Sequence, residues 1–291
     1  MRMAESLVVP PVKTLIEMLA LERTGADLFT GHAPRDDGFR IFGGAAVAQS
    51  LLAAYDSVGD RVCHSLHCYF IHPGDPAKPV LFRVDRTRDG GAFATRHVSA
   101  MQDGRTILEL LASFQRPSGP SFEHQAPLPA APAPETLIDD DLRGVSVGIQ
   151  LRNVRLPRPG FDVETLPPRH QTWFRSQQSL GPEIRFHQAA LAYASDFAQL
   201  PTIVQPHPVT WDTPEFQFTS LDHAIWFHRP FDFTNWHLCD METPSSSGER
   251  GLSRSTIYGQ DGTLVATVVQ EAMIRMREPN PLSQSILDAM V

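Results

Sequence analysis

An internal repeat limits the fold of this chain more than any other feature. Residues 96–115, "RHVSAMQDGRTILELLASFQ", and residues 254–273, "RSTIYGQDGTLVATVVQEAM", match at an offset of 158 residues, which sets Arg96 opposite Arg254. Both segments hold an Asp-Gly pair between two strand-like runs, which is typical of a tight β-hairpin. A helix-like and a strand-like segment precede each hairpin in the same order, so the repeat predicts a duplicated α+β unit.

Each unit has the pattern of one helix followed by an antiparallel meander. Small-residue helix candidates lie at 43–54 and 186–200. The strand candidates of the first half lie at 64–71, 79–87, 94–102 and 105–115. A meander of this kind buries its helix against one face of the sheet, and two units in one chain would set their sheets edge to edge. A shorter amphipathic helix is expected at 11–22.

The composition changes between the two halves. Six prolines fall within residues 117–134, which is too dense for a helix or a central strand. The sequence therefore predicts an N-terminal unit (1–118), an extended linker (119–143) and a C-terminal unit (144–291).

Charge and hydropathy exclude several classes of partner. The formal charge is −8 and the 25 Lys and Arg residues form no run, which argues against nucleic acid. No stretch approaches the length of apolar sequence that a membrane span needs. The three cysteines form no C-x-x-C motif and are expected as reduced thiols in a cytoplasmic protein.

Two catalytic motifs fail for lack of context. The "GVSVG" run (144–148) resembles a nucleophile elbow, but that role needs a strand-to-helix turn at Ser146, and the residues that follow alternate as a strand does. Five histidines could suggest zinc: His64, His67, His72, His223 and His228. Their spacing puts no two on one helical face and no cysteine pair assists them, so neither a metal nor another cofactor is expected.

Three polar residues occupy positions where the pattern requires apolar ones. Gln270 belongs to an otherwise apolar strand face, Ser220 shares a strand face with Asp222, and Asp196 lies on the small-residue face of its helix. Buried polar groups need partners, and one shared pocket would satisfy all three. A carboxylate, a hydroxyl and a carboxamide together can hold a water and remove its proton.

The motifs that hold these residues resemble the type II acyl-CoA thioesterases, the TesB-like proteins. The resemblance rests on "FGGAAVAQSLLAA" (42–54), "HSLHCYFIHPGD" (64–75), "YASDF" (193–197), "SLDHAIWFHRPF" (220–231) and "QDGTLVATVVQEAMIR" (260–275). It extends from about residue 12 to residue 276. It implies an α+β double hotdog fold and hydrolysis of fatty acyl-CoA to free acid and CoA without a metal or prosthetic group.

The resemblance also implies the residues of the site. The family's catalytic Asp, Thr or Ser, and Gln correspond to Asp196, Ser220 and Gln270, with serine at the hydroxyl position. Arg229 is expected to meet the CoA phosphates, and His64 is a further candidate for substrate binding. The first half shows no obvious matching Asp in "AQSLLAA", so we expect one active site per duplicated unit, with the first half supplying walls for the acyl chain.

Two other functions stay open at this point. A hotdog enoyl-CoA hydratase or dehydratase would pair a His with an Asp, for which His223 and Asp222 are the candidates. A non-catalytic acyl-CoA-binding protein would use the same pocket without chemistry. Because hotdog units bury their sheet edges by pairing, a homodimer or homotetramer is expected.

Overall fold

The computed structural model describes residues 12–34, 40–119, 121–139, 147–154, 165–197, 199–209 and 213–277. Ser146 of the elbow-like motif lies outside these ranges. Within them, no helix is both long and apolar enough to cross a membrane.

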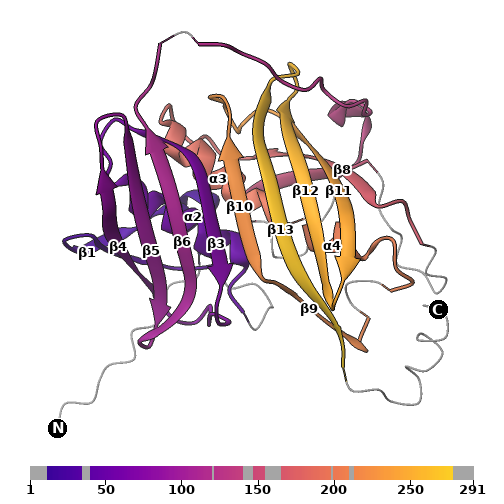
Figure 1. The fold of residues 1–291 in the computed structure, drawn as a ribbon, viewed down its shortest axis with the longest axis horizontal. Coiled ribbons are helices and arrows are strands. Elements are labelled where there is room, and N and C mark those ends of the chain that lie inside the picture. The colour runs from indigo at the N-terminus through magenta and orange to yellow at the C-terminus, as the bar shows by residue number, and fades with distance from the viewer. Residues whose placement is uncertain are drawn as a thin grey trace.

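Both halves combine one long helix with several antiparallel strands (Figure 1). The first half contains α1 (Leu15–Leu19), β1 (Glu22–Gly25), β2 (Leu28–Gly31), α2 (Gly43–Tyr55), β3 (Val62–Phe70), β4 (Val80–Asp89), β5 (Phe93–Gln102) and β6 (Arg105–Gln115). The second half contains η1 (Pro134–Thr136), β7 (Ile149–Asn153), β8 (Arg169–Ser176), α3 (Ile184–Ser195), α4 (Gln199–Val204), β9 (Phe216–Ser220), β10 (Asp222–Phe227), β11 (His237–Ser247), β12 (Arg250–Gly259) and β13 (Leu264–Met276).

The two half-sheets join at their edges into one 13-stranded sheet, in the order β1-β2-β4-β5-β6-β3-β10-β13-β12-β11-β8-β7, with β9 paired to β13. The junction is the antiparallel pair β3–β10, in which His67 faces Ala224. The helices α2 and α3 lie side by side behind the strands in Figure 1. This arrangement confirms the double hotdog fold.

Small residues let the two helices approach closely. A Cβ atom added to Gly44 of α2 would lie 2.4 Å from the carbonyl oxygen of Tyr193 in α3, so only glycine fits there. The alanines around this contact, such as Ala45 and Ala190, are fully buried. The small-residue pattern therefore serves helix-to-helix packing inside the curved sheet.

The two hairpins of the repeat differ in register by one residue. In the first half Arg96 pairs with Ala112, whereas in the second half Gln270 pairs with Ser253, and Arg254 pairs with Val269. Two residues (103–104) connect β5 to β6, whereas four (260–263) connect β12 to β13, so the pairing of β12 with β13 is shifted relative to the repeat. Arg96 and Arg254 are therefore not structural equivalents, in contrast to the single offset that the sequence suggested.

Three expected elements differ in length. The helix expected at 11–22 forms only as α1, which begins at a capping box made by Thr14 and Glu17. The helix expected at 186–200 divides into α3 and α4. The strand on which Ser220 and Asp222 were expected to share a face breaks at Leu221. Both interruptions fall beside the candidate site.

The proline-rich segment crosses from the first half to the second over one end of the strands (Figure 1). It contains one short element, η1, in its described part. The side chain of Gln125 fixes it to the loop before β13, donating to the Gly262 carbonyl and accepting from the Leu264 N–H. The division of the chain at residues 118 and 143 remains a prediction.

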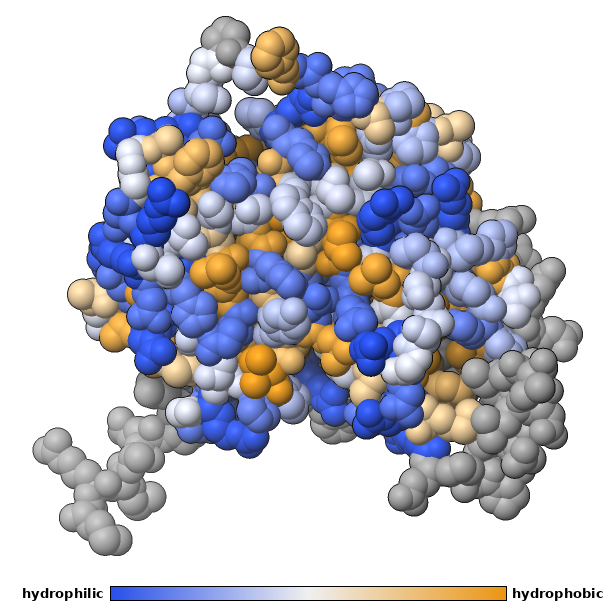
Figure 2. Space-filling model, in the orientation of Figure 1, coloured by the Kyte–Doolittle hydropathy of each residue, from blue (hydrophilic) through white to orange (hydrophobic). Residues whose placement is uncertain are grey.

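The outer face of the sheet, which faces the viewer in Figure 2, mixes polar and apolar side chains. Tyr69, Leu111 and Trp226 are large apolar residues on neighbouring strands of this face, and they are 54%, 50% and 43% exposed. They lie on β3, β6 and β10, at the junction of the two halves.

Candidate functional site

The three polar residues singled out in the sequence meet at the C-terminal end of α3. Asp196 is the C-cap residue of that helix and is only 7% exposed. Gln270 of β13 is fully buried. Its amide nitrogen donates to the Ser220 hydroxyl oxygen (2.7 Å), and its side chain lies close enough to Asp196 to oppose the rise in the pKa of that carboxyl. The N–H of Gly44, in the first turn of α2, donates to Asp196 Oδ2 (2.9 Å).

Ser220 reaches this group because the strand breaks. An unbroken strand would have put Ser220 and Asp222 on the same face, as the alternation predicted. The break at Leu221 instead leaves Ser220 facing Gln270, while Asp222 turns to the outer face and bonds His67 (2.9 Å). The predicted face-sharing of Ser220 and Asp222 was therefore wrong.

His223 is a further member of the site, which the sequence suggested only as a candidate for the hydratase reaction. It is fully buried on the inner face of β10. Its Nδ1 lies 2.5 Å from Gln270 Oε1, and its Nε2 lies 2.9 Å from the Ser195 hydroxyl. Because an amide oxygen can only accept, Nδ1 donates, and the orientation of the Gln270 amide is fixed with its nitrogen towards Ser220. The alternation of side chains along β10 places His223 on the inner face of the sheet, and this was the sequence feature that could have predicted its place in the site.

Burial shifts the proton equilibria of both ionisable groups. Loss of solvent raises the pKa of Asp196, and the nearby His223, the Gln270 amide and the Gly44 N–H oppose that rise. Burial likewise lowers the pKa of His223, against the attraction of Asp196. A buried carboxylate with a raised pKa is a stronger proton acceptor than an ordinary aspartate.

A cavity of about 410 Å³ opens beside these residues. Ser220, Gly43, Phe70, Ile107 and Leu108 are among the residues that line it. A Cβ atom on Gly43 would lie 2.8 Å from Asp196 Oδ2 and from the Phe70 ring. Glycine at the start of α2 therefore keeps the space in front of the carboxylate open.

Arg229 and His64 lie elsewhere. Both line a second cavity, of about 400 Å³, at the other end of the β3–β10 junction. His64 and Phe70 are six positions apart on β3, which corresponds to about 20 Å along a strand. The structure does not bring these two residues to Asp196.

The fold and the site together define a double hotdog protein with a buried carboxylate, an oriented amide and a hydroxyl at one cavity. The chain belongs to the acyl-CoA thioesterase family. Residues 154–273 match the model of the family described as "Acyl-CoA thioesterase", and residues 32–115 match "Acyl-CoA thioesterase N-terminal domain".

Relatives extend over most of the chain. It is 37% identical to "Acyl-coenzyme A thioesterase 8" of Homo sapiens, over 89% of this chain and 88% of that protein. It is 36% identical to "Acyl-CoA thioesterase 2" of Haemophilus influenzae, over 92% of this chain and 99% of that protein. Among solved structures, the "Acyl-CoA thioesterase II TesB2" of Mycobacterium marinum has a TM-score of 0.78 and 35% identity, over 91% of this chain and 98% of that one.

Proposed function

We propose that the protein hydrolyses fatty acyl-CoA to free fatty acid and CoA at the cavity of about 410 Å³ beside Asp196, the Asp196 cavity. The observation that supports this most directly is the Gln270 amide, which donates to Ser220 and lies close enough to Asp196 to oppose the rise in the pKa of that carboxyl. The amide thus brings the Ser220 hydroxyl, which lines the cavity, together with the Asp196 carboxylate. The apolar lining at Ile41, Ile107 and Leu108 suits an acyl chain.

In the proposed reaction a water is held by Ser220 and Gln270. Asp196 removes a proton from the water as its oxygen attacks the thioester carbonyl carbon. The tetrahedral intermediate then collapses, the carbon–sulfur bond breaks, and the proton on Asp196 passes to the departing CoA sulfur. The positive end of α2, at Gly43, borders the cavity and would stabilise the oxyanion.

His223 is proposed as a positioning residue in this reaction. Its Nδ1–H holds the Gln270 oxygen, so the amide nitrogen is directed to Ser220. The Ser195 hydroxyl at Nε2 supports the imidazole from behind. Through this chain of hydrogen bonds, the end of α3 sets the geometry of the water site.

The rival hydratase reaction needs an imidazole that can reach the substrate. Asp222 lies on the opposite sheet face from His223, so the adjacent pair does not act together. Both nitrogens of His223 are occupied, by Gln270 and by Ser195. Water attack directed by Asp196 is therefore the better candidate.

A thiol-release assay over a series of acyl-CoA chain lengths tests the proposed function. We expect free CoA to appear from saturated acyl-CoA, with no hydration of crotonyl-CoA by the same preparation. Hydration without thiol release would favour the hydratase. Tight acyl-CoA binding without either reaction would indicate a binding protein.

Two properties of the whole protein belong to the same proposal. Three thiols are free and buried, those of Cys63, Cys68 and Cys239, which fits a reducing compartment, so the cytoplasm is the proposed location. Fatty acid metabolism is the proposed setting because the proposed substrate is a fatty acyl-CoA. The exposed apolar residues of the outer face, Tyr69 and Trp226 among them, fit burial in a homodimer or homotetramer. Light scattering at several protein concentrations would measure the assembly.

A further inference from the structure

The second cavity mirrors the first across the β3–β10 junction. Its volume of about 400 Å³ is close to the 410 Å³ of the Asp196 cavity. It borders the start of α3 at Ile184, where the first cavity borders the start of α2 at Gly43. It also borders the end of β10 at Phe227, where the first borders the end of β3 at Phe70.

The strand register identifies what replaces each member of the site. Gln270 pairs with Ser253 in β12, and the corresponding pair in the first half is Ala112 with Arg96. Ala112 also pairs with Leu66, which occupies the position of His223. An alanine and a leucine thus stand where the amide and the imidazole stand in the other half.

The carboxylate has also left this cavity. The C-cap residue of α2 is Asp56, the counterpart of Asp196 at the end of α3. Its side chain is 38% exposed and pairs with Arg23 at 3.3 Å. The preceding residue, Tyr55, is buried, and its hydroxyl donates to Gln188, which lines the second cavity. The second cavity therefore keeps its volume but not the groups proposed for hydrolysis.

Positive charge lines the second cavity in an acidic protein. Arg116 and Arg229 are both lining residues. Their acidic partners, Asp60 at 3.6 Å and Glu123 at 3.9 Å, have side chains that are 72% and 76% exposed. The Arg116–Asp60 pair is exposed on both sides and contributes little stability, so it gives way easily to a better-placed anion. The Arg229 guanidinium is more buried and also donates to the Leu264 and His124 carbonyls, which hold it at the lining.

The histidines of the cavity add no charge to that of the arginines. Burial lowers the pKa of both His64 and His228. Their Nε2 atoms are bonded to Ser113 and Thr267. The guanidinium groups are therefore the cationic features of this lining.

We propose that the second cavity binds a fatty carboxylate, with its head group at Arg116 and Arg229 and its alkyl chain against Val62, Phe227 and Pro230. Guanidinium groups bind carboxylates through paired hydrogen bonds, and Val62, Phe227 and Pro230 supply apolar surface in the same lining. The proposal rests on the proposed function only for the source of the ligand, which would be the acid released at the Asp196 cavity. The chain would then hold its own product at a site separate from the chemistry.

Isothermal titration with dodecanoate, kept below its aggregation concentration, tests this site. The unmodified chain is compared with an Arg116→Ala/Arg229→Ala variant and with an Arg83→Ala/Arg105→Ala control, in which two exposed arginines outside the cavity lining are removed. We expect the first pair of changes to weaken binding about tenfold or more, because a charged hydrogen-bonding partner is lost, and the control pair to leave it unchanged. Dodecanol, which has no charge, should bind much more weakly than dodecanoate.

Dodecanoate in the Asp196 cavity would respond to neither arginine pair, so only the loss specific to Arg116 and Arg229 supports the site. Equal binding by all three proteins would overturn the proposal. Arginine-dependent binding of CoA alone, without dodecanoate binding, would also overturn it, since the ligand group would then be a phosphate. If the double variant unfolds, Arg116→Ala by itself serves, because that side chain is 55% exposed.

The same preparations separate this proposal from the proposed function. Arginine-dependent dodecanoate binding without thiol release from dodecanoyl-CoA would sink the hydrolase and leave the second site standing. Thiol release without arginine-dependent binding would do the reverse.

Discussion

The ends of α2 and α3 carry the same residue in two different environments. Asp56 and Asp196 are both C-cap residues with helical backbone angles (φ −61°, ψ −17° and φ −80°, ψ −16°). Asp196 is buried against Gln270 and the Gly44 N–H, whereas Asp56 turns outward to Arg23. The helix end alone therefore does not make a site. The neighbouring strand determines whether a site forms, because β13 supplies the Gln270 amide at the position where β6 has Ala112.

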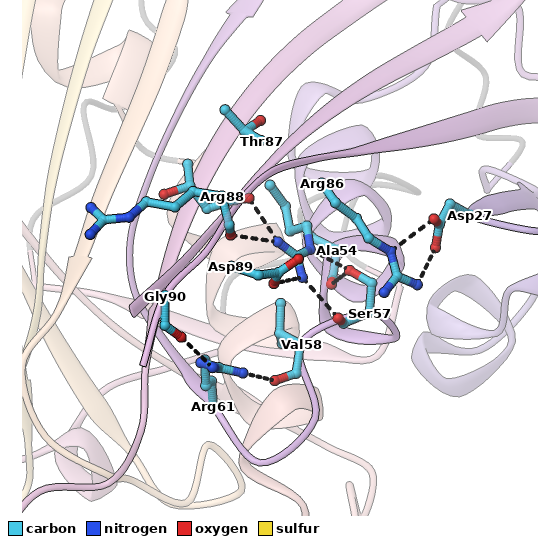
Figure 3. A network of polar contacts seen from close by, with 12 residues as sticks. Asp27, Ala54, Ser57, Val58, Arg61, Arg86, Thr87, Arg88, Asp89 and Gly90 are labelled. Carbon is cyan, nitrogen blue, oxygen red and sulfur yellow. Dashed lines mark hydrogen bonds and ion pairs between the residues drawn. The ribbon is translucent and has the colours of Figure 1, made fainter. Parts of the chain in front are cut away.

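The chain that follows each helix differs as well. After α2, the buried Arg96 bonds the Ser57 carbonyl (2.9 Å) and Asp89 (2.5 Å), within the network that Figure 3 shows around Ser57, Val58 and Asp89. After α3, the corresponding strand position is Ser253, which donates to Gln199, and Gln199 in turn holds the Ser195 carbonyl. The residues that follow α2 are therefore held by a buried arginine, whereas the end of α3 is held by the uncharged side chains of Ser253 and Gln199.

The largest effect among the supporting residues is expected at Gln270. Gln270→Ala removes the donor to Ser220 beside Asp196 and should lower kcat about a hundredfold, as the loss of an oriented catalytic donor does. Gln188→Ala removes a buried glutamine from the other cavity and should leave kcat within about twofold, because that cavity has no part in the proposed chemistry. Thiol release under saturating substrate measures both. Equal losses of kcat in the two variants would contradict the proposal that hydrolysis takes place only at the Asp196 cavity.

A smaller effect is expected at His223. His223→Phe should lower kcat about tenfold while changing KM little, because the amide orientation is lost but the cavity remains. His223→Asn keeps an N–H near the position of Nδ1 and should recover most of the rate. Failure of asparagine to improve on phenylalanine would show that His223 acts only through packing.

The pH profile should reflect the burial of Asp196. The base must be ionised to act, and burial raises its pKa above the ordinary value of 3.8. We therefore expect kcat/KM to rise with pH through a midpoint above 3.8 and to fall off on the acid side of it. A midpoint at or below the ordinary aspartate value would argue against Asp196 as the base.

The smallest effect is expected at Cys63, which pairs with Phe114 in β6 as Ser220 pairs with Ala272 in β13. Burial raises the pKa of this thiol, so it stays protonated and unreactive. Cys63→Ser should change neither kcat nor KM by more than about twofold, because a hydroxyl alone does not restore a base or an amide. Steady-state kinetics on purified protein measures this. A clear gain in rate would mean that the second cavity is closer to catalysis than its lining suggests.

The sequence could predict the residues whose local pattern was out of place. Gln270 on an apolar strand face and Asp196 on the small face of a helix were both anomalies of periodicity, and the structure buries both. The place of His223 beside Gln270 was not predicted, because a histidine on the inner face of a strand is often a satisfied core residue, and its partners Ser195 and Gln270 are 28 and 47 residues away.

Two further features were outside what periodicity can encode. The face of Ser220 depends on the break at Leu221, which the alternating pattern does not reveal. Asp56 follows directly after Tyr55, just beyond the "AQSLLAA" motif in which a matching Asp was sought. The structure shows that Asp56 and Asp196 are equivalent, because each is the C-cap residue of the long helix in its half.

Replacing the two helix-end aspartates one at a time tests the central claim most directly. Thiol release from an acyl-CoA substrate is compared for the unmodified chain, Asp196→Asn and Asp56→Asn, with thermal unfolding as a check on the fold. We predict that Asp196→Asn lowers kcat about a thousandfold, since a general base is lost, and that Asp56→Asn stays near the unmodified rate. Full activity in Asp196→Asn, or an equal loss in Asp56→Asn, would contradict the assignment of hydrolysis to the Asp196 cavity.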